Sequence, residues 1–383
     1  MTSRERVRIA LAHKEADHIP LDLNGTGSTG ICGRAYQQLR RYLCLPERPL
    51  KIWHVMQQLA DVDEDFLSYL KVDTRHIVSN APTHWKMEIT ERDGSLYYTD
   101  EWGITWRMPV VDGHYYDMCS NPLRDAETVQ DVERHHWPNP TDPARFAGLA
   151  EKAKQLYEQT GAAITFGPMC AGVFDMAAWL CGYEQCMMNL ACANIRLVQA
   201  IMEKVTDIKC QYWETALPII GSHVDMVMEC DDLGGQYGPL FNTNIYEQYI
   251  KPLHKRLLGT IRKHTDAAIY FHSCGSIYDF LPGFIECGVQ VLNPVQVSAA
   301  NMDTKVLKKE FGKDIVFWGG GCETQTILWR GTVQEVRDEV KRRIDDLAPG
   351  GGFVFAQVHN IQDGVPPENL MAMWETWAEY GKY

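Results

Sequence analysis

The alternation of short apolar segments with helical patterns is the feature that most limits what this chain can fold into. Eight segments are rich in β-branched or aromatic residues and are followed by residues typical of turns. Strands that alternate with helices form parallel sheets, and eight of them favour a closed barrel over an open sheet. We therefore predict an α/β protein, a single (β/α)8 TIM barrel over residues 1–383. The predicted strands are 19–23, 73–78, 162–166, 224–229, 267–272, 289–293, 314–318 and 352–357.

The segment before the last predicted strand has the clearest helical pattern. Thr332 and Glu335 are spaced as a capping box, and the glycines at 350–352 end the helix. Between them, apolar residues recur at three- and four-residue intervals, as on one buried helix face. These residues are Val333, Val336, Val340, Ile344 and Leu347.

Residues 80–140 interrupt the alternation. They contain three segments typical of antiparallel strands, and Asp93-Gly94 is placed to turn the chain between the first two. A loop with Tyr115 and Tyr116 follows. We predict a hairpin-rich insertion after the second barrel strand that covers the barrel mouth as a lid. Its predicted strands are 87–91, 96–99 and 102–109.

Charge and hydropathy limit the kinds of molecule that this protein is expected to bind. The net charge is −13, acidic and basic residues are interspersed, and no basic stripe is present, so we expect no nucleic-acid partner. No run of about 18 apolar residues occurs, and the first residues lack the apolar core of a signal peptide. We therefore expect a cytoplasmic protein without membrane contact. The sequence leaves the oligomeric state open, and a homodimer is among the options.

The cysteines are expected to be reduced. There are 12 of them in 383 residues, without the dense and regular spacing of a secreted scaffold. Cys181, Cys186 and Cys192 fall in a helical pattern, so we predict that they are small core residues.

Metal-binding side chains gather where the predicted strands end. His272 and Cys274 lie at the end of the fifth strand, two residues apart, so both side chains point to the same face. Zn²⁺ prefers imidazole and thiolate ligands, and a catalytic zinc has three protein ligands and one open position. His359, after the eighth strand, and Cys322, after the seventh, are the alternatives for the third ligand.

Acids and amides lie at the same end of the predicted barrel. Glu229 and Asp232 follow the fourth strand and are the candidate catalytic acids. Glu229, like Cys322, is also a candidate to replace or support a metal ligand. Asp231 and Asp232 are expected to bind substrate or anchor a loop, because a site with imidazole and thiolate ligands does not need two carboxylates. Three side chains are candidates for orienting the substrate, namely Asn24, Gln236 and Gln296.

Several motifs together resemble the uroporphyrinogen decarboxylase superfamily, and specifically its corrinoid-dependent methyltransferase branch. They cover nearly the whole chain and comprise 8–20 (RIALAHKEADHIP), 272–275 (HSCG), 292–296 (LNPVQ), 317–321 (FWGGG), and 359–360 (HN) through 366–369 (PPEN). The resemblance implies a (β/α)8 barrel, in agreement with the strand count. Members that decarboxylate porphyrinogens carry an arginine-rich M-R-Q-A-G-R signature soon after the first strand. Here residues 24–28 contain no arginine, which disfavours that activity because a substrate with many carboxylates would lack cationic partners.

The resemblance also implies a zinc site. Methyltransferases of this branch hold zinc with an H-x-C after strand five and a cysteine at the end of strand eight. His272 and Cys274 match the first two ligands, whereas His359 stands at the position of the cysteine. Histidine is a competent replacement that makes the site less anionic, but the departure keeps Cys322 as an alternative.

The function implied is methyl transfer from a small methoxylated aryl ether to the Co(I) corrinoid of a partner protein. Zinc would polarise the ether oxygen, and the corrinoid must come from a partner because no D-x-H-x-x-G sequence is present. Segment 99–106 resembles members associated with methoxylated aromatic compounds. The lid is rich in aromatic residues, and we expect Trp102 and Tyr116 to contact the substrate.

Other functions stay open at this point. The nearest alternative is a methylcobalamin-dependent methyltransferase that uses a thiol or a folate, with the opposite direction of transfer. A decarboxylase acting on a smaller acid would need neither metal nor cobalamin. A zinc- or corrinoid-binding module without catalysis is the third, and an open metal position counts against it.

Overall fold

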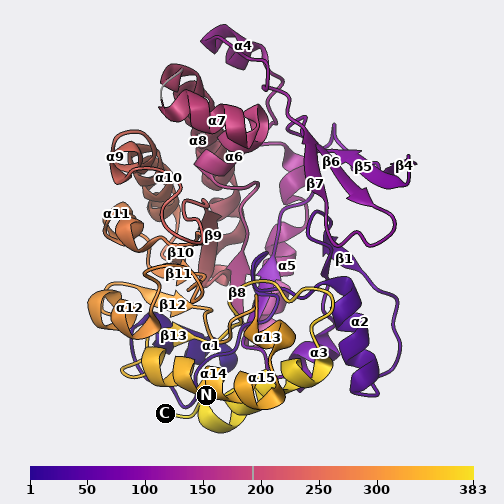
Figure 1. Cartoon of the computed structure of the whole chain (residues 1–383), viewed down its shortest axis with the longest axis vertical. Coiled ribbons are helices and arrows are strands. Elements are labelled where there is room, and N and C mark those ends of the chain that lie inside the picture. The colour runs from indigo at the N-terminus through magenta and orange to yellow at the C-terminus, as the bar shows by residue number, and fades with distance from the viewer. Residues whose placement is uncertain (192–193) are drawn as a thin grey trace.

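The computed structural model describes residues 1–191 and 194–383 and confirms an α/β fold with a parallel barrel sheet. Seven parallel strands lie side by side in the order β13-β12-β11-β10-β9-β8-β3. Figure 1 shows the strands of this sheet at the centre of the molecule with helices packed outside them. The strands are β3 (Thr74–Ile77), β8 (Ala163–Phe166), β9 (Met226–Cys230), β10 (Ala268–His272), β11 (Val291–Asn293), β12 (Val316–Trp318) and β13 (Phe353–Val354).

The segment predicted as the first strand closes the sheet into a barrel. Leu21 pairs in parallel with Phe355, just after β13, and its carbonyl oxygen accepts the N–H of Asp73, just before β3, at 2.8 Å. The pairing ends early because the Asp22 side chain accepts the Gly25 N–H and Asn24 adopts a positive φ of 65°. The first strand is therefore a short bridge between two edges rather than a regular strand.

Helices cover the outside of the sheet. The capping box predicted for Thr332 and Glu335 is present, and it begins α14. The helices are α1 (Ser3–Leu11), α2 (Gly33–Tyr42), α3 (Glu64–Tyr69), α4 (Val129–Arg134), α5 (Leu149–Gln159), α6 (Val173–Cys181), α7 (Tyr183–Ala191), α8 (Ile195–Ile220), α9 (Thr243–Ile245), α10 (Lys251–His264), α11 (Leu281–Cys287), α12 (Thr304–Phe311), α13 (Ile327–Arg330), α14 (Val333–Leu347) and α15 (Pro367–Tyr380). Short 3-10 or π segments are η1 (Pro143–Phe146), η2 (Gly221–His223), η3 (Tyr246–Ile250) and η4 (Tyr278–Phe280).

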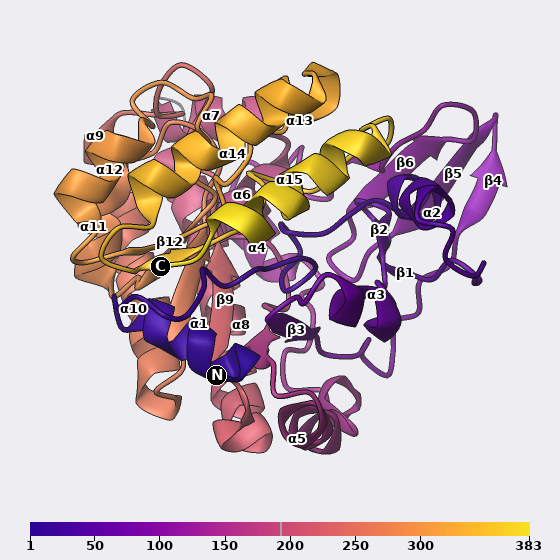
Figure 2. The same cartoon turned by 90° about the horizontal axis from the view of Figure 1, so that it is seen from below.

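The barrel lumen is filled by its own small core. Alternate residues of the strands point inward and form a cluster separate from the larger core between sheet and helices. Val7 and Ala10 of α1 join this cluster, and Figure 2, seen from below, shows α1 across the lower ends of the strands. The strand residues in the cluster are Ala163, Met226, Met228, Tyr270, Val291, Val316, Trp318 and Val354. The barrel is therefore packed up to the level of Tyr270, and open chemistry is confined to the carboxyl ends of its strands.

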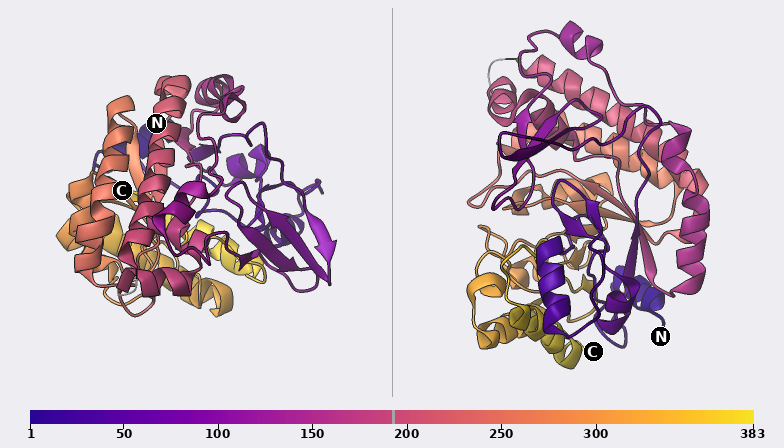
Figure 3. Two further views of the ribbon diagram at one scale, coloured as in Figure 1. Left: turned by 90° about the horizontal axis from the view of Figure 1, so that it is seen from above. Right: turned by 90° about the vertical axis from the view of Figure 1, so that its right-hand side faces the viewer.

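An antiparallel sheet is inserted between β3 and β8. Asp93 and Gly94 have φ values of 48° and 68° and make the tight turn between its first two strands, as expected for this dipeptide. The sheet lies on one side of the barrel (Figures 1 and 3), where Trp106 packs edge-on against Trp179 of α6 at 5.2 Å. Its strands are β4 (Thr90–Arg92), β5 (Ser95–Thr99), β6 (Thr105–Pro109) and β7 (Asp117–Ser120). A separate hairpin, β1 (Ile52–His54) and β2 (Leu59–Ala60), precedes α3.

Cys181 and Cys186 are buried core residues, whereas Cys192 lies outside the described residues. Among the described helices, each is too short or too polar to cross a membrane.

Candidate metal centre

The alternation of side chains along neighbouring strands builds the site. Cys230 at the end of β9 is in register with His272 at the end of β10, and His272 is in register with Asn293 of β11. These residues lie two positions beyond Met228, Tyr270 and Val291, which fill the lumen. The same inward face therefore carries polar groups one layer above the apolar core.

Three side chains with metal-binding atoms meet at this level. Each of His272, Cys274 and His359 offers a ligand atom that lies within 4.8 Å of the other two. Cys274 Sγ is 3.3 Å from His272 Nε2, and the two imidazole rings have their centroids 5.5 Å apart. Ligand atoms at about 2.0 and 2.3 Å from a tetrahedral zinc stand roughly 3.5 Å from each other, so this spacing fits one zinc ion.

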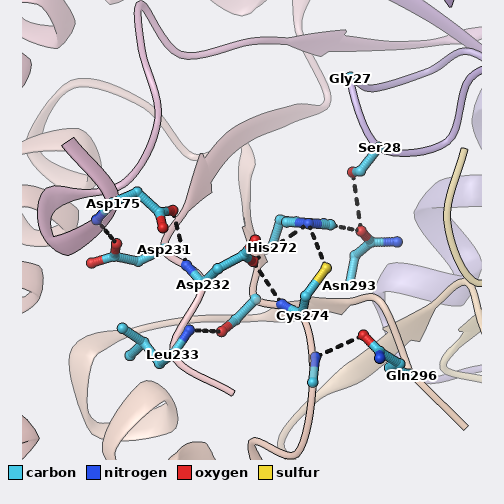
Figure 4. A network of polar contacts seen from close by, with 12 residues as sticks. Gly27, Ser28, Asp175, Asp231, Asp232, Leu233, His272, Cys274, Asn293 and Gln296 are labelled. Atoms are coloured by element: carbon cyan, nitrogen blue, oxygen red, sulfur yellow. Dashed lines mark hydrogen bonds and ion pairs between the residues drawn. The ribbon is translucent and has the colours of Figure 1, made fainter. Parts of the chain in front are cut away.

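Asn293 fixes which nitrogen of His272 faces the cluster. The Asn293 amide donates to the carbonyl oxygen of Trp318 at 2.8 Å, which turns its Oδ1 toward His272. His272 Nδ1 donates to that Oδ1 at 2.5 Å, and Ser28 donates to it at 3.1 Å (Figure 4). The lone pair of Nε2 is thereby left toward Cys274, as in metal sites whose histidines are oriented through their second nitrogen.

The surroundings of the other two candidate ligands act in opposite directions on their readiness to bind a metal ion. Burial and the neighbouring His272 lower the pKa of His359 to about 4, so this imidazole is neutral at pH 7 with a free lone pair. Burial and the carboxylate of Asp232 raise the pKa of the Cys274 thiol well above its usual value. A thiolate therefore needs a cation beside it, and metal ligation supplies one.

Asp232 borders the cluster, and buried acids hold it in place. Its Oδ1 accepts the Cys274 N–H at 2.7 Å and lies 3.7 Å from His272 Nε2, while its side chain is 40% exposed. Asp175 of α6 accepts the Asp232 N–H at 2.9 Å (Figure 4). Asp231 points the other way, where it accepts two N–H groups at the start of α6 and pairs with His254 at 2.8 Å. Both acids therefore hold backbone N–H groups, which is one of the two roles expected for them, and the other role, substrate binding, stays a prediction.

Close backbone packing fixes the loop that carries Cys274. Gly275 has a φ of +85°, and a Cβ there would lie 2.2 Å from the carbonyl oxygen of Gly234. Gln296 accepts the Gly275 N–H at 2.8 Å and donates to Gln236 at 3.2 Å. These two glutamines, predicted to orient a substrate, lie beside the metal-binding loop and hold it to its neighbours.

Asn24 forms hydrogen bonds with two aromatic side chains that were not among the predicted site residues. Its Oδ1 accepts the indole N–H of Trp53 at 3.0 Å, and its carbonyl oxygen accepts Nδ1–H of His76 at 2.7 Å. The rings of Trp53 and His76 are stacked at 4.3 Å, and burial lowers the pKa of His76 to about 4. His76 could have been found from its place at the end of the second predicted strand. Trp53 lies in the β1–β2 hairpin, for which no strand was predicted.

Two predicted site residues face away from the cluster. Glu229 is in register with Phe271 on the outer face of the sheet, where it pairs with Lys209 of α8 at 2.9 Å and accepts the indole N–H of Trp213 at 2.5 Å. Cys322 is fully buried in the larger core, and this burial together with nearby Glu339 of α14 raises the pKa of its thiol. Neither side chain joins the group formed by the two histidines and Cys274 among the described residues.

The predicted aromatic contacts of the lid are packing residues in this structure. Trp102 is 4% exposed and lies edge-on to Trp137, with ring centroids 6.1 Å apart. Tyr116 is 3% exposed and lies edge-on to Tyr98 at 4.9 Å. Both rings are buried within or beside the inserted sheet and leave no free face for a ligand.

Comparison with known proteins identifies the family. Residues 115–380 match the protein family described as uroporphyrinogen decarboxylase (URO-D), which is more than half of the chain. The chain belongs to the uroporphyrinogen decarboxylase family. The uroporphyrinogen decarboxylase of Geobacter metallireducens is 22% identical over 279 residues, which cover 70% of this chain and 74% of that relative. The uroporphyrinogen decarboxylase of Geobacter sulfurreducens is 22% identical over 282 residues, with the same coverage.

A solved structure of this fold covers nearly the whole chain. The methyltransferase from Methanosarcina mazei superposes with a TM-score of 0.63 over 99% of both chains, at 16% sequence identity. The resemblance to the uroporphyrinogen decarboxylase superfamily is thus confirmed, and a methyltransferase is among the solved structures that share the fold. Within one fold, the activity of a member depends on the residues at its barrel mouth.

Proposed function

We propose that this protein is a zinc-dependent methyltransferase that moves a methyl group from a small methoxylated aryl ether to the Co(I) corrinoid of a partner protein. The observation that carries the proposal is the group of His272, Cys274 and His359, whose ligand atoms lie within 4.8 Å of one another at the carboxyl ends of the barrel strands. Catalytic groups of such barrels lie at this end.

The donor set fits a catalytic zinc. Two imidazoles and one thiolate are three ligands, which leaves the fourth position for a substrate. His272 is oriented by Asn293, and His359 is neutral at pH 7. A zinc ion held here would act as a Lewis acid that makes an aryl ether oxygen a better leaving group.

The proposed reaction takes up one proton for each methyl group that is transferred. The methyl carbon leaves the ether oxygen and bonds to cobalt, which supplies the electron pair, and the aryl oxygen takes up a proton to give a phenol. Asp232 lies beside the ligands and is 40% exposed, so its carboxyl group is placed to pass that proton from solvent. Its contact with the Cys274 N–H holds it at this position.

An aromatic surface lies near the cluster and suits a flat substrate. A Cβ on Gly27 would lie 3.8 Å from the ring of Trp53, and the next residue, Ser28, donates to the Asn293 that orients His272. The stacked rings of Trp53 and His76 therefore border the loop that reaches the metal ligands. Their polar N–H groups are already bonded to Asn24, which favours an apolar ring over a charged ligand against this surface.

The test joins metal analysis to an optical assay. Purified protein is analysed for zinc and then mixed with a Co(I) corrinoid protein and guaiacol-type methoxyarenes. We expect one zinc per chain and conversion of the Co(I) spectrum to that of a methylated corrinoid, with release of the phenol. Omitting either the enzyme or the methoxyarene is the control, and neither mixture should convert.

Other outcomes of this assay would replace the proposal. Zinc without methyl transfer from any aryl ether would favour a methyltransferase that uses a thiol or a folate. Protein without stoichiometric metal would refute zinc-dependent transfer and favour a decarboxylase, the activity in the names of the Geobacter relatives. The absence of cationic side chains in residues 24–28 argues against a substrate with many carboxylates.

A further inference from the structure

We propose that Asn360 is the positioning residue for His359 and that it ties this ligand to the β1–β2 hairpin. The inference rests on the proposed function only in requiring that the centre binds a metal ion. It concerns how the third ligand is held, which the donor set alone does not explain.

The two histidines of the centre are held in different ways. The His272 ring is fixed by the hydrogen bond from its Nδ1 to Asn293. For His359, no hydrogen bond to either ring nitrogen is found among the described residues, and its ring contact is with His272 at 5.5 Å. The position of the His359 ring therefore depends on the backbone that carries it.

Asn360 anchors that backbone immediately beside His359. Asn360 is 1% exposed, and its side chain makes three hydrogen bonds. Oδ1 accepts the Gly30 N–H at 2.6 Å, and Nδ2 donates to the carbonyl oxygen of Gly27 at 2.9 Å and to Gln57 Oε1 at 2.5 Å. A buried amide with both ends satisfied is costly to move, because each lost bond leaves a buried polar group unpaired.

The backbone on the far side of Asn360 is held to the same loop. Ile361 donates its N–H to the Gly30 carbonyl oxygen at 2.9 Å and accepts the Cys32 N–H at 2.8 Å. A Cβ on Gly30 would lie 3.3 Å from Asn360 Oδ1, which leaves little room for the loop to shift. The strand-eight segment and the loop after the first strand are thus locked together next to His359.

Gln57 extends the anchor to the hairpin and the inserted sheet. It lies in the turn between β1 and β2, and its neighbour Met56 accepts the Tyr116 N–H at 2.8 Å. Contacts therefore run from the inserted sheet through the hairpin turn and Asn360 to the residue that carries the third ligand. His359 is the ligand whose placement depends on elements outside the barrel.

The experiment measures metal binding in Asn360→Asp and in a matched control. Asn360→Asp keeps the size of the side chain and its acceptor but removes both donated hydrogen bonds. The control is Asn369→Asp on α15, because Asn369 is 2% exposed and also donates to two backbone carbonyl oxygens, those of Leu328 and Gly331. Zn²⁺ affinity is measured by competition with a chromophoric chelator, and the coordination by the absorption spectrum of the Co²⁺ form.

We expect Asn360→Asp to weaken Zn²⁺ binding by about 10- to 100-fold, the usual effect of losing a residue that orients a metal ligand. The d–d bands of the Co²⁺ form should change, while the charge-transfer band from Cys274 is retained. Asn369→Asp should lower stability without altering the affinity or the spectrum. Gln57→Leu, which removes one acceptor from the Asn360 amide, should weaken Zn²⁺ binding less and serves if Asn360→Asp does not fold.

Native affinity and a native Co²⁺ spectrum in Asn360→Asp, or in Gln57→Leu if the first variant does not fold, would overturn this inference. An equal loss of affinity in Asn369→Asp would do the same, since the effect would then be general destabilisation. Methyl transfer enters neither readout, so a native protein that binds zinc but transfers no methyl group would refute the proposed function alone.

Discussion

At the scale of single residues, the surroundings of the sulfur atom distinguish Cys274 from Cys322. Cys274 is half-buried, with its sulfur 3.3 Å from an imidazole nitrogen and its N–H held by Asp232. Cys322 is fully buried among core side chains. Both follow barrel strands in the sequence, but only the first has partners that a metal ion needs.

Replacing these two cysteines should give opposite results. We expect Cys274→Ala to lose bound zinc while its free energy of unfolding stays within about 1 kcal/mol of that of the metal-free native protein, because the site lies above a packed lumen. Cys322→Ala should retain zinc and lose about 1–2 kcal/mol of stability through the cavity it leaves. Metal content by mass spectrometry and urea unfolding distinguish the two. A Cys322→Ala variant without zinc would restore Cys322 as a ligand.

The buried pair of Glu229 and Lys209 should act on stability rather than on chemistry. Lys209 also donates to the carbonyl oxygens of Cys170 and Ala171, so it joins α8 to the loop before α6. Lys209→Met leaves Glu229 charged and buried, and we expect it to lower the free energy of unfolding by about 3–5 kcal/mol. The double variant Lys209→Met with Glu229→Gln should recover part of that loss. Denaturant unfolding measures both, and zinc content should stay native in any variant that folds.

At the scale of elements, the inserted sheet contains a titratable group with a structural role. Asp100 lies at the turn between β5 and β6, where it accepts the indole N–H of Trp106 at 2.8 Å and the backbone N–H groups of Trp102 and Ile104. Burial raises the pKa of Asp100 to about 6. The folded protein therefore keeps this proton at pH values where the unfolded chain has already released it.

Stability should respond to pH accordingly. Because the folded state binds more protons between about pH 4 and 6, the contribution of Asp100 to the free energy of unfolding falls as the pH rises through this range. Asp100→Asn does not titrate, so native stability should decline relative to the variant by about 1–2 kcal/mol from pH 4 to 6. Urea unfolding at several pH values measures the difference. A difference that does not change with pH would contradict the raised pKa.

Elements with strong local patterns were predicted well from the sequence. All eight segments predicted as barrel strands take part in the barrel, and each is a run of β-branched or aromatic residues that ends in a turn. The Asp93-Gly94 turn follows from the tolerance of these two residues for positive φ. The hairpin of β1 and β2 was missed because its turn contains no glycine, asparagine or proline, and Gln58 supplies the positive φ of 52°. The exposed strand β7 was also missed, since its side chains show no alternation of burial.

The candidate site was predictable where the position of a residue along its strand determines the direction of its side chain. His272 and Cys274 follow from the two-residue period of a strand, and His359 from the end of the last strand. The same reasoning placed Glu229 at the mouth, but it did not identify which face of β9 that residue occupies. Asn293 and Asn360 act through hydrogen bonds to segments distant in sequence, namely Trp318 and residues 27–57, which no local pattern reveals.

At the scale of the whole molecule, we expect the proposed metal centre to add little to the stability of the fold. The lumen beneath it is filled, and α1 closes the lower end with ion pairs from Arg6 to Asp73 and from Arg8 to Asp225. Removing the metal with a chelator should therefore leave the far-ultraviolet circular dichroism unchanged and shift the Tm by no more than ligand release explains. Scanning calorimetry with and without chelator measures this. A collapse of the folding transition on chelation would mean that the metal is structural.

The filled lumen also imposes an order of events. Inward side chains such as Met228, Tyr270 and Trp318 occupy the space below the centre. Under the proposed function, a methyl donor and a corrinoid protein would therefore both arrive from the carboxyl ends of the strands. The small reactant has to enter first, because the large one obstructs the way once it has docked. Saturating amounts of corrinoid protein should then slow turnover instead of speeding it. The packed lumen would in this way determine the kinetic mechanism, in which the two reactants bind in a compulsory order.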